Sequence, residues 1–310
     1  MCIRDSKISK SNKKNEVNVN EAEILMEELG VIDLIITAHQ HQTLVGQDHG
    51  TVYVQAGQNA EELVHVKIKF KKRTNTYEVE EISPEVIDLN NYDEDEALLN
   101  VTYYDRKAVE HWASEAINET EINAPVKDLA ELVGQPHPFA QLLHDSIRLA
   151  YNYQISCVHI PRNGEEGLKG VITNRVLYDA YPYPDKPVDL TIKGECIKGI
   201  LEFSYSYLEF EKDTLKSTLI DETLCTFWQG FNYTVDMNQA PFNRVTLDGI
   251  DLNGLYRITM TDYCYRNYQS YLEDAIIHHT SESTMSTLIA KHLSDKHYSI
   301  KLKNNFKVIK

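Results

Sequence analysis

Residues 170–202 read GVITNRVLYDAYPYPDKPVDLTIKGECIKGILE, and the class of fold follows from this stretch. Residues 188–192 (VDLTI) indicate a strand. Residues 194–210 open with a glycine and read as a helix that directly follows this strand. Between residues 155 and 268 short strand-like and helix-like segments alternate, and another strand is expected over residues 255–259. The sequence therefore predicts a protein of the α/β and α+β classes.

Further helices and a strand are expected on both sides of this stretch. Residues 97–118 and 138–151 each carry apolar side chains near a 3.6-residue period, which predicts two helices. A last helix is expected over residues 284–293, with Ser283 as its N-cap. Residues 299–308 alternate in the manner of a terminal edge strand.

The amino-terminal part shows the pattern of a second sheet. A helix is expected over residues 20–29, followed by the apolar run VIDLIIT at residues 31–37, which has the length of a buried strand. Residues 51–56 and 63–70 alternate apolar and polar side chains, which predicts strands with one wet face, and residues 77–82 add a further strand. This order of elements is that of the second half of an α/β domain.

Composition and charge exclude several classes of protein. The 310 residues are 42% apolar and 25% charged, a profile typical of folded chains and not of low-complexity ones. With 31 basic and 47 acidic residues the net charge is −16, and a polynucleotide partner is not expected because no basic stripe extends beyond residues 67–73. No apolar run approaches the roughly 20 residues that cross a bilayer. The five cysteines lie far apart and predict neither a zinc cluster nor a disulfide framework.

The clearest chemical motif is ITAHQHQ, in which His39 and His41 follow the predicted buried strand and precede an expected loop over residues 42–50. In an extended segment, residues two apart point the same way, and α/β folds place their sites at the carboxyl ends of strands. Neutral imidazole binds Zn, Mn, Fe or Ni. Because this spacing also arises by chance, a metal site and an inert pair of histidines both remain open.

The order of motifs along the chain resembles that of the 5′-nucleotidase family. Residues 20–42 and 50–70 look like the end of a calcineurin-like metallophosphoesterase domain, with HQH in the place of the family's Gly-His-x-His motif. Residues 170–202, 227–237 (FWQGFNYTVDM) and 245–263 (VTLDGIDLNGLYRITMTDY) are similar to the C-terminal domain of the same family. The YPYP segment looks closest to the 2′,3′-cyclic-nucleotide 2′-phosphodiesterase/3′-nucleotidase branch.

This resemblance implies a division into domains. Residues 1–19 would be a disordered or foreign leader, and residues 20–83 the C-terminal piece of a four-layer α/β/β/α metallophosphoesterase sandwich. Residues 84–124 would form an acidic linker and a helix, and residues 125–310 the α+β nucleotide-recognition domain. The chain is therefore expected to be an amino-terminally truncated member of the family.

The resemblance also implies a function and its site residues. The intact parent would hydrolyse phosphate esters of nucleotides with two divalent ions, Zn, Mn or similar, and His39 and His41 would each contact one ion. Tyr183 and Tyr263 fall where the family stacks two aromatic rings on the nucleobase. Asn232 and Asp262 are candidate polar contacts to the substrate. The expected partner is a nucleotide or nucleoside.

Several family motifs have no counterpart in this sequence. The Asp-x-His, Gly-Asp and Asn-His elements are not found before His39, and Ala38 replaces a glycine of the metal motif. No catalytic residue is therefore assigned, and this chain by itself is expected to bind metal weakly or not at all and to be catalytically incompetent. A non-catalytic nucleotide- or ligand-binding module is the alternative interpretation, and an interaction protein with inert histidines is a third.

The resemblance implies a cellular location as well. Members of the family are usually exported to the periplasm, the cell wall or the medium, so an extracytoplasmic location is expected. No signal peptide is visible in the sequence, whose first 20 residues are polar and rich in lysine and asparagine. The oligomeric state is not predicted.

Overall fold

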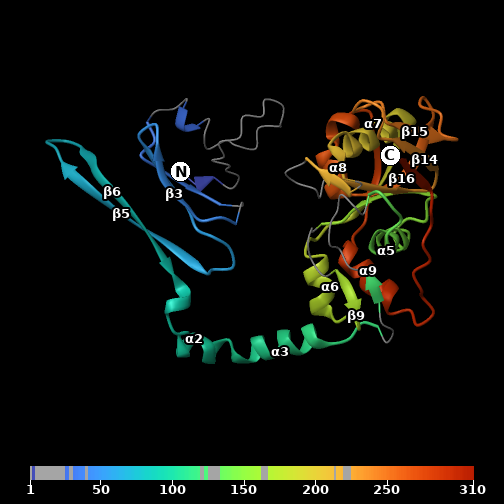
Figure 1. The fold of residues 1–310 in the computed structure, drawn as a ribbon. Helices are drawn as coiled ribbons and strands as arrows, with labels where there is room; N and C mark the ends of the chain where they lie inside the picture. Colours follow the sequence, from blue (N-terminus) through green and yellow to red (C-terminus); the bar gives the residue numbers. More distant parts are fainter. Residues whose placement is uncertain are drawn as a thin grey trace. The chain divides into compact units, whose positions relative to one another are not determined.

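The structure, a computed structural model, describes residues 2–3, 25–27, 31–38, 41–118, 122–124, 133–161, 167–212, 214–218 and 225–310. The chain divides into two compact units, Met1–Thr102 and Tyr103–Lys310. Both units combine sheets with helices, which confirms the predicted mixed α/β and α+β class (Figure 1). Within these described ranges, no helix has the length and apolar character needed to cross a membrane.

A four-stranded sheet with the order β1-β2-β4-β3 forms the centre of the first unit. Its strands are β1 (Cys2–Ile3), β2 (Leu34–Thr37), β3 (Leu44–Asp48) and β4 (Thr51–Gln55). The wet face predicted for residues 51–56 is wrong, because β4 is buried on both faces. The hydroxyl of Thr51 donates to the carbonyl of Ile32, and Thr37 donates to the side chain of Gln55, so the polar face of β4 is internally bonded.

The strand β3 occupies part of the segment that was expected to be a loop. It pairs with β4 through a two-residue turn formed by His49 and Gly50, since Asp48 is the partner of Thr51. The φ angles of His49 and Gly50 are 46° and 83°, the positive values that tight hairpin turns require. The histidine–glycine pair was the sequence signal for this hairpin.

A small apolar cluster supports this sheet. Residues 25–27 are helical, and the rest of the helix predicted over residues 20–29 lies outside the described residues. Met26 and Ile35 are fully buried against one another, with Tyr53 packed beside them. β2 begins three residues later than predicted, because Val31 is 82% exposed.

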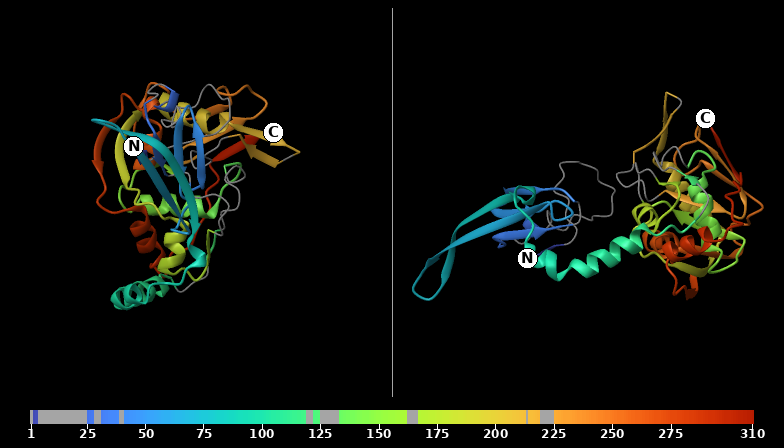
Figure 2. Two further views of the ribbon diagram at one scale, coloured as in Figure 1. Left: turned by 90° about the vertical axis from the view of Figure 1, so that its left-hand side faces the viewer. Right: turned by 90° about the horizontal axis from the view of Figure 1, so that it is seen from below.

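A long hairpin completes the first unit. It consists of β5 (Glu62–Lys72) and β6 (Tyr77–Asp88), and the right-hand view of Figure 2 shows it as an extended two-stranded ribbon. Residues 84–88, predicted to begin the linker, instead continue β6. The reason is cross-strand pairing, because Val86 faces Val64 and Ile82 faces Ile68 along one apolar face of the ribbon.

The helix predicted over residues 97–118 is divided into two. A 3₁₀ turn, η1 (Leu89–Asn91), precedes α2 (Glu96–Val101), and α3 (Tyr103–Ser114) follows after Thr102. The predicted apolar face of α3 is largely exposed, since Val109 is 62% and Trp112 44% accessible. Trp112 is nevertheless anchored, because its ring packs edge-on against Tyr178 at a centroid distance of 5.3 Å.

The second unit is built on a five-stranded sheet with the order β13-β8-β16-β10-β17. β8 and β16 are parallel, and the other neighbours are antiparallel. The strands are β8 (Ile155–His159), β10 (Pro187–Lys193), β13 (Thr226–Gln229), β16 (Leu255–Thr261) and β17 (Ile276–Thr280). The strands predicted over residues 188–192 and 255–259 are confirmed, and each extends by one or two residues at its ends.

Helices cover both faces of this sheet. Figure 1 shows α7 and α8 on one face and α5 and α9 on the other. The helices are α5 (Pro138–Ile147), α6 (Asn174–Ala180), α7 (Gly194–Ser206), α8 (Asp262–Asn267) and α9 (Met285–Leu293), with a 3₁₀ turn η3 (Gln269–Tyr271) after α8. The largest fully buried side chains between these layers include Phe139, Tyr181, Tyr205, Trp228 and Tyr268.

Three small sheets lie around this layered core. The β11–β12 hairpin and the β7–β9 pair each have two strands, and a third sheet has the order β15-β14-β18. Their strands are β7 (Ile122–Ala124), β9 (Leu168–Gly170), β11 (Leu208–Glu211), β12 (Thr214–Ser217), β14 (Asn232–Asp236), β15 (Val245–Asp248) and β18 (Phe306–Ile309). In this arrangement, β14 continues from β13 and carries the chain away from the main sheet.

Four predicted boundaries in the second unit are corrected. α7 ends at Ser206 and not at residue 210, because the chain there turns into β11. The last strand covers only Phe306–Ile309 of the predicted residues 299–308, and α5 ends at Ile147. The N-cap of α9 is Thr284 and not Ser283, because the Thr284 hydroxyl accepts a hydrogen bond from the amide of Thr287.

Candidate functional site

The strand register brings the two segments that carry Tyr183 and Tyr263 to the same end of the main sheet. Pro187, the first residue of β10, is the partner of Thr261, the last residue of β16. Tyr183 lies four residues before Pro187, and Tyr263 lies two residues after Thr261. The segments are also bonded to one another, since Asp262 and Lys186 exchange hydrogen bonds of 2.8 and 2.9 Å.

The ring of Tyr263 is partly exposed and rests on a histidine. The imidazole of His159, the last residue of β8, is stacked on Tyr263 with a centroid distance of 4.1 Å and an interplanar angle of 20°. α8 begins at Asp262 because the hydroxyl of Thr261 caps the amide of Cys264, which places Tyr263 in the first turn. Tyr263 is therefore held on a short helix directly above the carboxyl end of β8.

His159 itself is almost completely buried, with 1% of its surface exposed. Its Nδ1 atom lies 3.2 Å from the hydroxyl of Thr261 and 3.8 Å from the sulfur of Cys264. Its Nε2 atom lies 3.5 Å from Oδ2 of Asp185 and has no hydrogen bond of good geometry. A buried polar atom in this position calls for a physical reason, because leaving it unbonded is costly.

Asp185 follows the YPYP segment and is 4% exposed. The Tyr181 hydroxyl donates to its Oδ2 atom at 3.2 Å, and the guanidinium of Arg266 lies 3.9 Å from Oδ1. Burial is the main reason that the pKa of Asp185 is raised, whereas His159 opposes this effect. The carboxyl group thus connects the loop before β10 to His159 under the Tyr263 ring.

Two buried thiols lie beside the same histidine. Burial and the hydrogen bond between Cys157 and Cys264 raise the pKa of the Cys157 thiol well above its usual value. Burial also opposes ionisation of Cys264, but hydrogen bonds from Cys157 and His159 outweigh it and lower the pKa of Cys264 to about 5. Both thiols are fully enclosed, so they belong to the packing beneath the site and not to its surface.

The remaining predicted residues of this end lie at its surface. The side chain of Tyr183 is 51% exposed. Asp262 forms an ion pair of 3.2 Å with Arg266, one helical turn further along α8. Tyr183, Tyr263 and Asp262 therefore all lie toward one end of the sheet, together with the ion pair of Asp262 and Arg266.

Asn232 does not belong to this group. It begins β14, which continues from β13 beyond Gln229, and Gln229 pairs with Ser156 near the amino end of β8. Asn232 therefore lies at the opposite end of the main sheet from Tyr263. There it lines an open hollow of about 940 Å³, together with Arg148, Tyr153, Gln154, Gln229, Phe231, Asp248, Tyr256, Lys303 and other residues.

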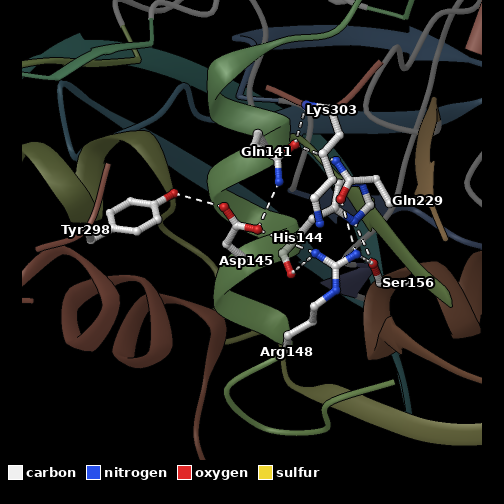
Figure 3. A network of polar contacts seen from close by, with 8 residues as sticks. All are labelled: Gln141, His144, Asp145, Arg148, Ser156, Gln229, Tyr298 and Lys303. Atoms are coloured by element: carbon white, nitrogen blue, oxygen red, sulfur yellow. Dashed lines mark hydrogen bonds and ion pairs between the residues drawn. The ribbon is translucent and has the colours of Figure 1, made fainter. Parts of the chain in front are cut away.

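A network of polar contacts stiffens the wall of this hollow (Figure 3). Arg148, at the carboxyl end of α5, donates to Gln229 at 3.1 Å and to Ser156 at 3.3 Å and pairs with Asp145 at 3.4 Å. The Nδ1 atom of His144 lies 2.8 Å from the Ser156 hydroxyl. Burial, followed by the charge of Arg148, lowers the pKa of His144 well below its usual value, so this imidazole is neutral in the folded protein.

Of the two histidines of the predicted metal motif, the structure describes only His41. His39 lies outside the described residues. His41 is exposed and has a φ angle of 54°. Over the part of the chain that the structure describes, no three His, Cys, Asp or Glu side chains converge in a way that could hold a metal ion. A catalytic ion needs about three protein ligands, so the described residues do not fit a two-metal centre.

Sequence reasoning missed His159 and Asp185, although a signal for each was present. Asp185 directly follows YPYP, and His159 directly follows the mostly apolar residues ISCV at positions 155–158. What the sequence could not show is that β8 and β16 are parallel neighbours, because this pairing joins residues about 100 positions apart.

Comparison with known proteins identifies the family. The model of the 5′-nucleotidase C-terminal domain matches residues 118–272, half of the chain. A search of the curated proteins returned no match.

Solved structures share the fold. A Staphylococcus aureus protein assigned as a 5′-nucleotidase, in complex with alpha-ketoglutarate, superposes with a TM-score of 0.79 at 21% identity over 99% of this chain and 62% of its own. A 5′-nucleotidase precursor from Thermus thermophilus gives 0.53 at 18% identity, over 89% of this chain and 59% of its own. The NAD nucleotidase of Haemophilus influenzae gives 0.50 at 12% identity, over 90% and 62%.

The chain thus spans about three fifths of the length of the structures that it matches. The matched family domain includes the sheet end that carries Tyr183, His159 and Tyr263. The prediction drawn from the motifs is therefore confirmed at the level of the family: this chain belongs to the 5′-nucleotidase family and carries the C-terminal domain of that family.

Proposed function

We propose that the second unit binds the nucleoside part of a nucleotide between the rings of Tyr183 and Tyr263. The observation that supports this most is the arrangement of Tyr263, a partly exposed ring that is stacked on buried His159 at 4.1 Å. A ring fixed in this way loses little freedom when a flat ligand stacks on it. The exposed ring of Tyr183, on the bonded neighbouring segment, supplies a second aromatic surface.

Stacking between aromatic rings suits a site with broad base preference. Every nucleobase has a flat π surface, and stacking on an aromatic side chain contributes about 1–3 kcal/mol per base. The ion pair of Asp262 and Arg266 beside the rings offers an acceptor and a donor for polar groups of the ligand. We therefore expect the ligand to be a nucleoside or nucleotide and not a polynucleotide. The proposal specifies neither the base nor the position of the phosphate ester.

For the whole protein we propose hydrolysis of nucleotide phosphate esters with two divalent ions, as membership of the family suggests. The described residues of this chain do not provide the ligands of such a centre, and no step of the reaction is derived from them. The prediction that this chain by itself does not hydrolyse nucleotides stays a prediction. An extracytoplasmic location is proposed on the same basis, and one relative of this fold is a 5′-nucleotidase precursor.

A non-catalytic nucleotide-binding protein is the second candidate. It is favoured because the rings and their supports all lie in the second unit, whereas no three His, Cys, Asp or Glu side chains among the described residues converge in a way that could hold a metal ion. The two candidates share the base site and differ only in hydrolysis. Release of phosphate from AMP or 3′-AMP by the full chain with Zn²⁺ or Mn²⁺ added would favour the enzyme and contradict the prediction of incompetence.

Adenosine binding tests the proposed site directly. We expect the full chain to bind adenosine without added metal, as measured by isothermal titration calorimetry. Tyr263→Ala should weaken binding by about tenfold or more, because one stacked ring is lost. Tyr183→Ala should give a smaller loss, since its exposed ring is less fixed before binding.

A matched control uses a tyrosine elsewhere on the same unit. Tyr104 on α3 is 82% exposed, and Tyr104→Ala should leave the affinity for adenosine unchanged. Unaltered affinity in Tyr263→Ala, or an equal loss in Tyr104→Ala, would exclude the proposed base site.

A further inference from the structure

The buried pair of His159 and Asp185 has no place in the nucleoside site as described so far. Neither side chain reaches the surface, since they are 1% and 4% exposed. Burying an imidazole next to a carboxyl group is expensive unless the two are well bonded, and here Nε2 of His159 lies 3.5 Å from Oδ2 of Asp185 without a hydrogen bond of good geometry. A purely apolar pair of the same size would avoid this cost, so the pair needs another explanation.

The contacts of His159 all restrict the orientation of its ring. On one edge, Nδ1 lies 3.2 Å from the hydroxyl of Thr261. On the other edge, Asp185 faces Nε2, and Asp185 is itself bonded to the hydroxyl of Tyr181 at 3.2 Å. A planar ring that is contacted on two opposite edges cannot rotate freely about its side-chain bonds.

The ring of Tyr263 stacks on the face of this fixed His159 ring. The two rings are only 20° from parallel, with centroids 4.1 Å apart. The supporting residues come from three places in the fold: the end of β8, the end of β16 and the segment before β10. His159 thereby connects the loop that carries Tyr183 to the short helix that carries Tyr263.

We propose that His159, oriented by Asp185, is a positioning residue for nucleoside binding: its flat ring supports Tyr263 so that the tyrosine is already ordered before the base arrives. This inference rests on the proposed base site at Tyr263. His159 does not touch the ligand and acts only through the tyrosine ring. Its contribution is the side-chain ordering that Tyr263 would otherwise undergo on binding.

The size of the effect follows from the cost of ordering one aromatic side chain. Removing the support should weaken adenosine binding by about fivefold, less than the loss of Tyr263 itself. The flat shape of the ring, and not its nitrogen atoms, should carry the effect. Variants that keep the flat ring and lose the nitrogen atoms, or the reverse, can therefore distinguish support of Tyr263 from a general structural role of His159.

The test compares two replacements of His159 in the full chain, with adenosine as the ligand in calorimetric titrations. His159→Gln keeps polar atoms but lacks a flat ring, and we expect about fivefold weaker binding. His159→Phe keeps the ring. It is made together with Asp185→Asn, so that no buried carboxylate loses its neighbour, and we expect affinity within about twofold of Asp185→Asn alone.

A double-mutant cycle adds a readout that simple destabilisation would not move. In the Tyr263→Ala background, His159→Gln should cause no further loss of adenosine affinity, because the residue through which it acts is gone. Thermal unfolding of each variant confirms that the titrated protein is folded at the temperature of measurement. If either His159 variant unfolds, the other one still decides whether the ring or its nitrogen atoms matter.

The outcomes are distinguishable from failure of the base site. Wild-type affinity in Tyr263→Ala would remove the proposed function and this inference with it. Loss of affinity in Tyr263→Ala together with wild-type affinity in His159→Gln would overturn only the positioning role. An equal loss in His159→Gln and in His159→Phe with Asp185→Asn, the latter measured against Asp185→Asn alone, would overturn it too, because a flat ring would then not preserve the affinity.

Discussion

Burial shifts the pKa of individual polar residues inside the second unit. His144 is buried beside Arg148, and burial lowers its pKa well below the usual 6.5. Asp185 is buried beside His159, and burial raises its pKa. Sequence patterns indicated that these positions would be polar, but they could not indicate burial, because the Ser156 and Arg148 contacts come from different elements. Charge state at this scale is a property of packing.

His144 makes the stability of the second unit depend on pH. The unfolded chain takes up a proton as the pH falls through 6.5, whereas the folded protein keeps His144 neutral. The stabilisation is therefore fully present above pH 6.5 and is lost at lower pH. Its loss amounts to at most about 1.4 kcal/mol per pH unit.

His144→Asn removes this titration and keeps a hydrogen-bonding atom near Ser156. We expect the difference in unfolding free energy between wild type and variant, from urea titrations followed by near-ultraviolet circular dichroism, to be largest at pH 7.5. It should shrink as the pH is lowered to 5.5. His111→Asn serves as the control, because His111 is 81% exposed. A difference independent of pH would show that His144 takes up a proton in the folded protein as readily as in the unfolded chain.

At the scale of elements, turns and cross-strand pairs set the boundaries that periodicity alone placed incorrectly. The His49–Gly50 turn creates β3 in a segment expected to be a loop, and Val86 and Ile82 extend β6 into the expected linker. In contrast, β10 and β16 were predicted correctly, because a short apolar run in the centre of a sheet has few alternatives. Local pattern predicts central strands well and edge strands poorly.

The connection from β13 to β14 depends on one glycine. Gly230 has a φ angle of 109°, and a Cβ atom there would lie 2.3 Å from the carbonyl oxygen of Gln154. We expect Gly230→Ala to lower the unfolding free energy by about 3 kcal/mol or more, because the backbone of a neighbouring strand would have to move. Urea denaturation measures this loss.

Gly249 provides the matched comparison. Its φ angle is also positive, at 72°, but nothing lies within 4 Å of an added Cβ atom. Gly249→Ala should therefore cost only the backbone strain, about 1 kcal/mol. Equal losses in the two variants would mean that the chain relaxes around Gly230 and that the close approach to Gln154 carries no energetic weight.

For the molecule as a whole, charge and family membership point in opposite directions. A net charge of −16 repels anionic nucleotides, whereas the 5′-nucleotidase family is associated with them. Composition alone argued against a polynucleotide partner but could not identify a small ligand. The motif order identified the family because it extends over both units, while the metal motif by itself left two interpretations open.

This charge leads to a prediction about salt. The affinity for AMP should increase by about threefold between low and high ionic strength, because salt screens the repulsion between the protein and the phosphate group. The affinity for uncharged adenosine should stay the same, which makes it the internal control. Calorimetric titrations at both ionic strengths measure the two ligands. A decrease for AMP would reveal that local cations such as Arg266 outweigh the global field.

Both tryptophans of the chain, Trp112 on α3 and Trp228 on β13, belong to the second unit. One is half-exposed against Tyr178 and the other is 2% exposed in the core. Tryptophan fluorescence, excited at the red edge of protein absorbance, consequently comes only from the second unit. A single optical signal from the intact chain can thus follow the second unit alone, and no dissection of the polypeptide is required.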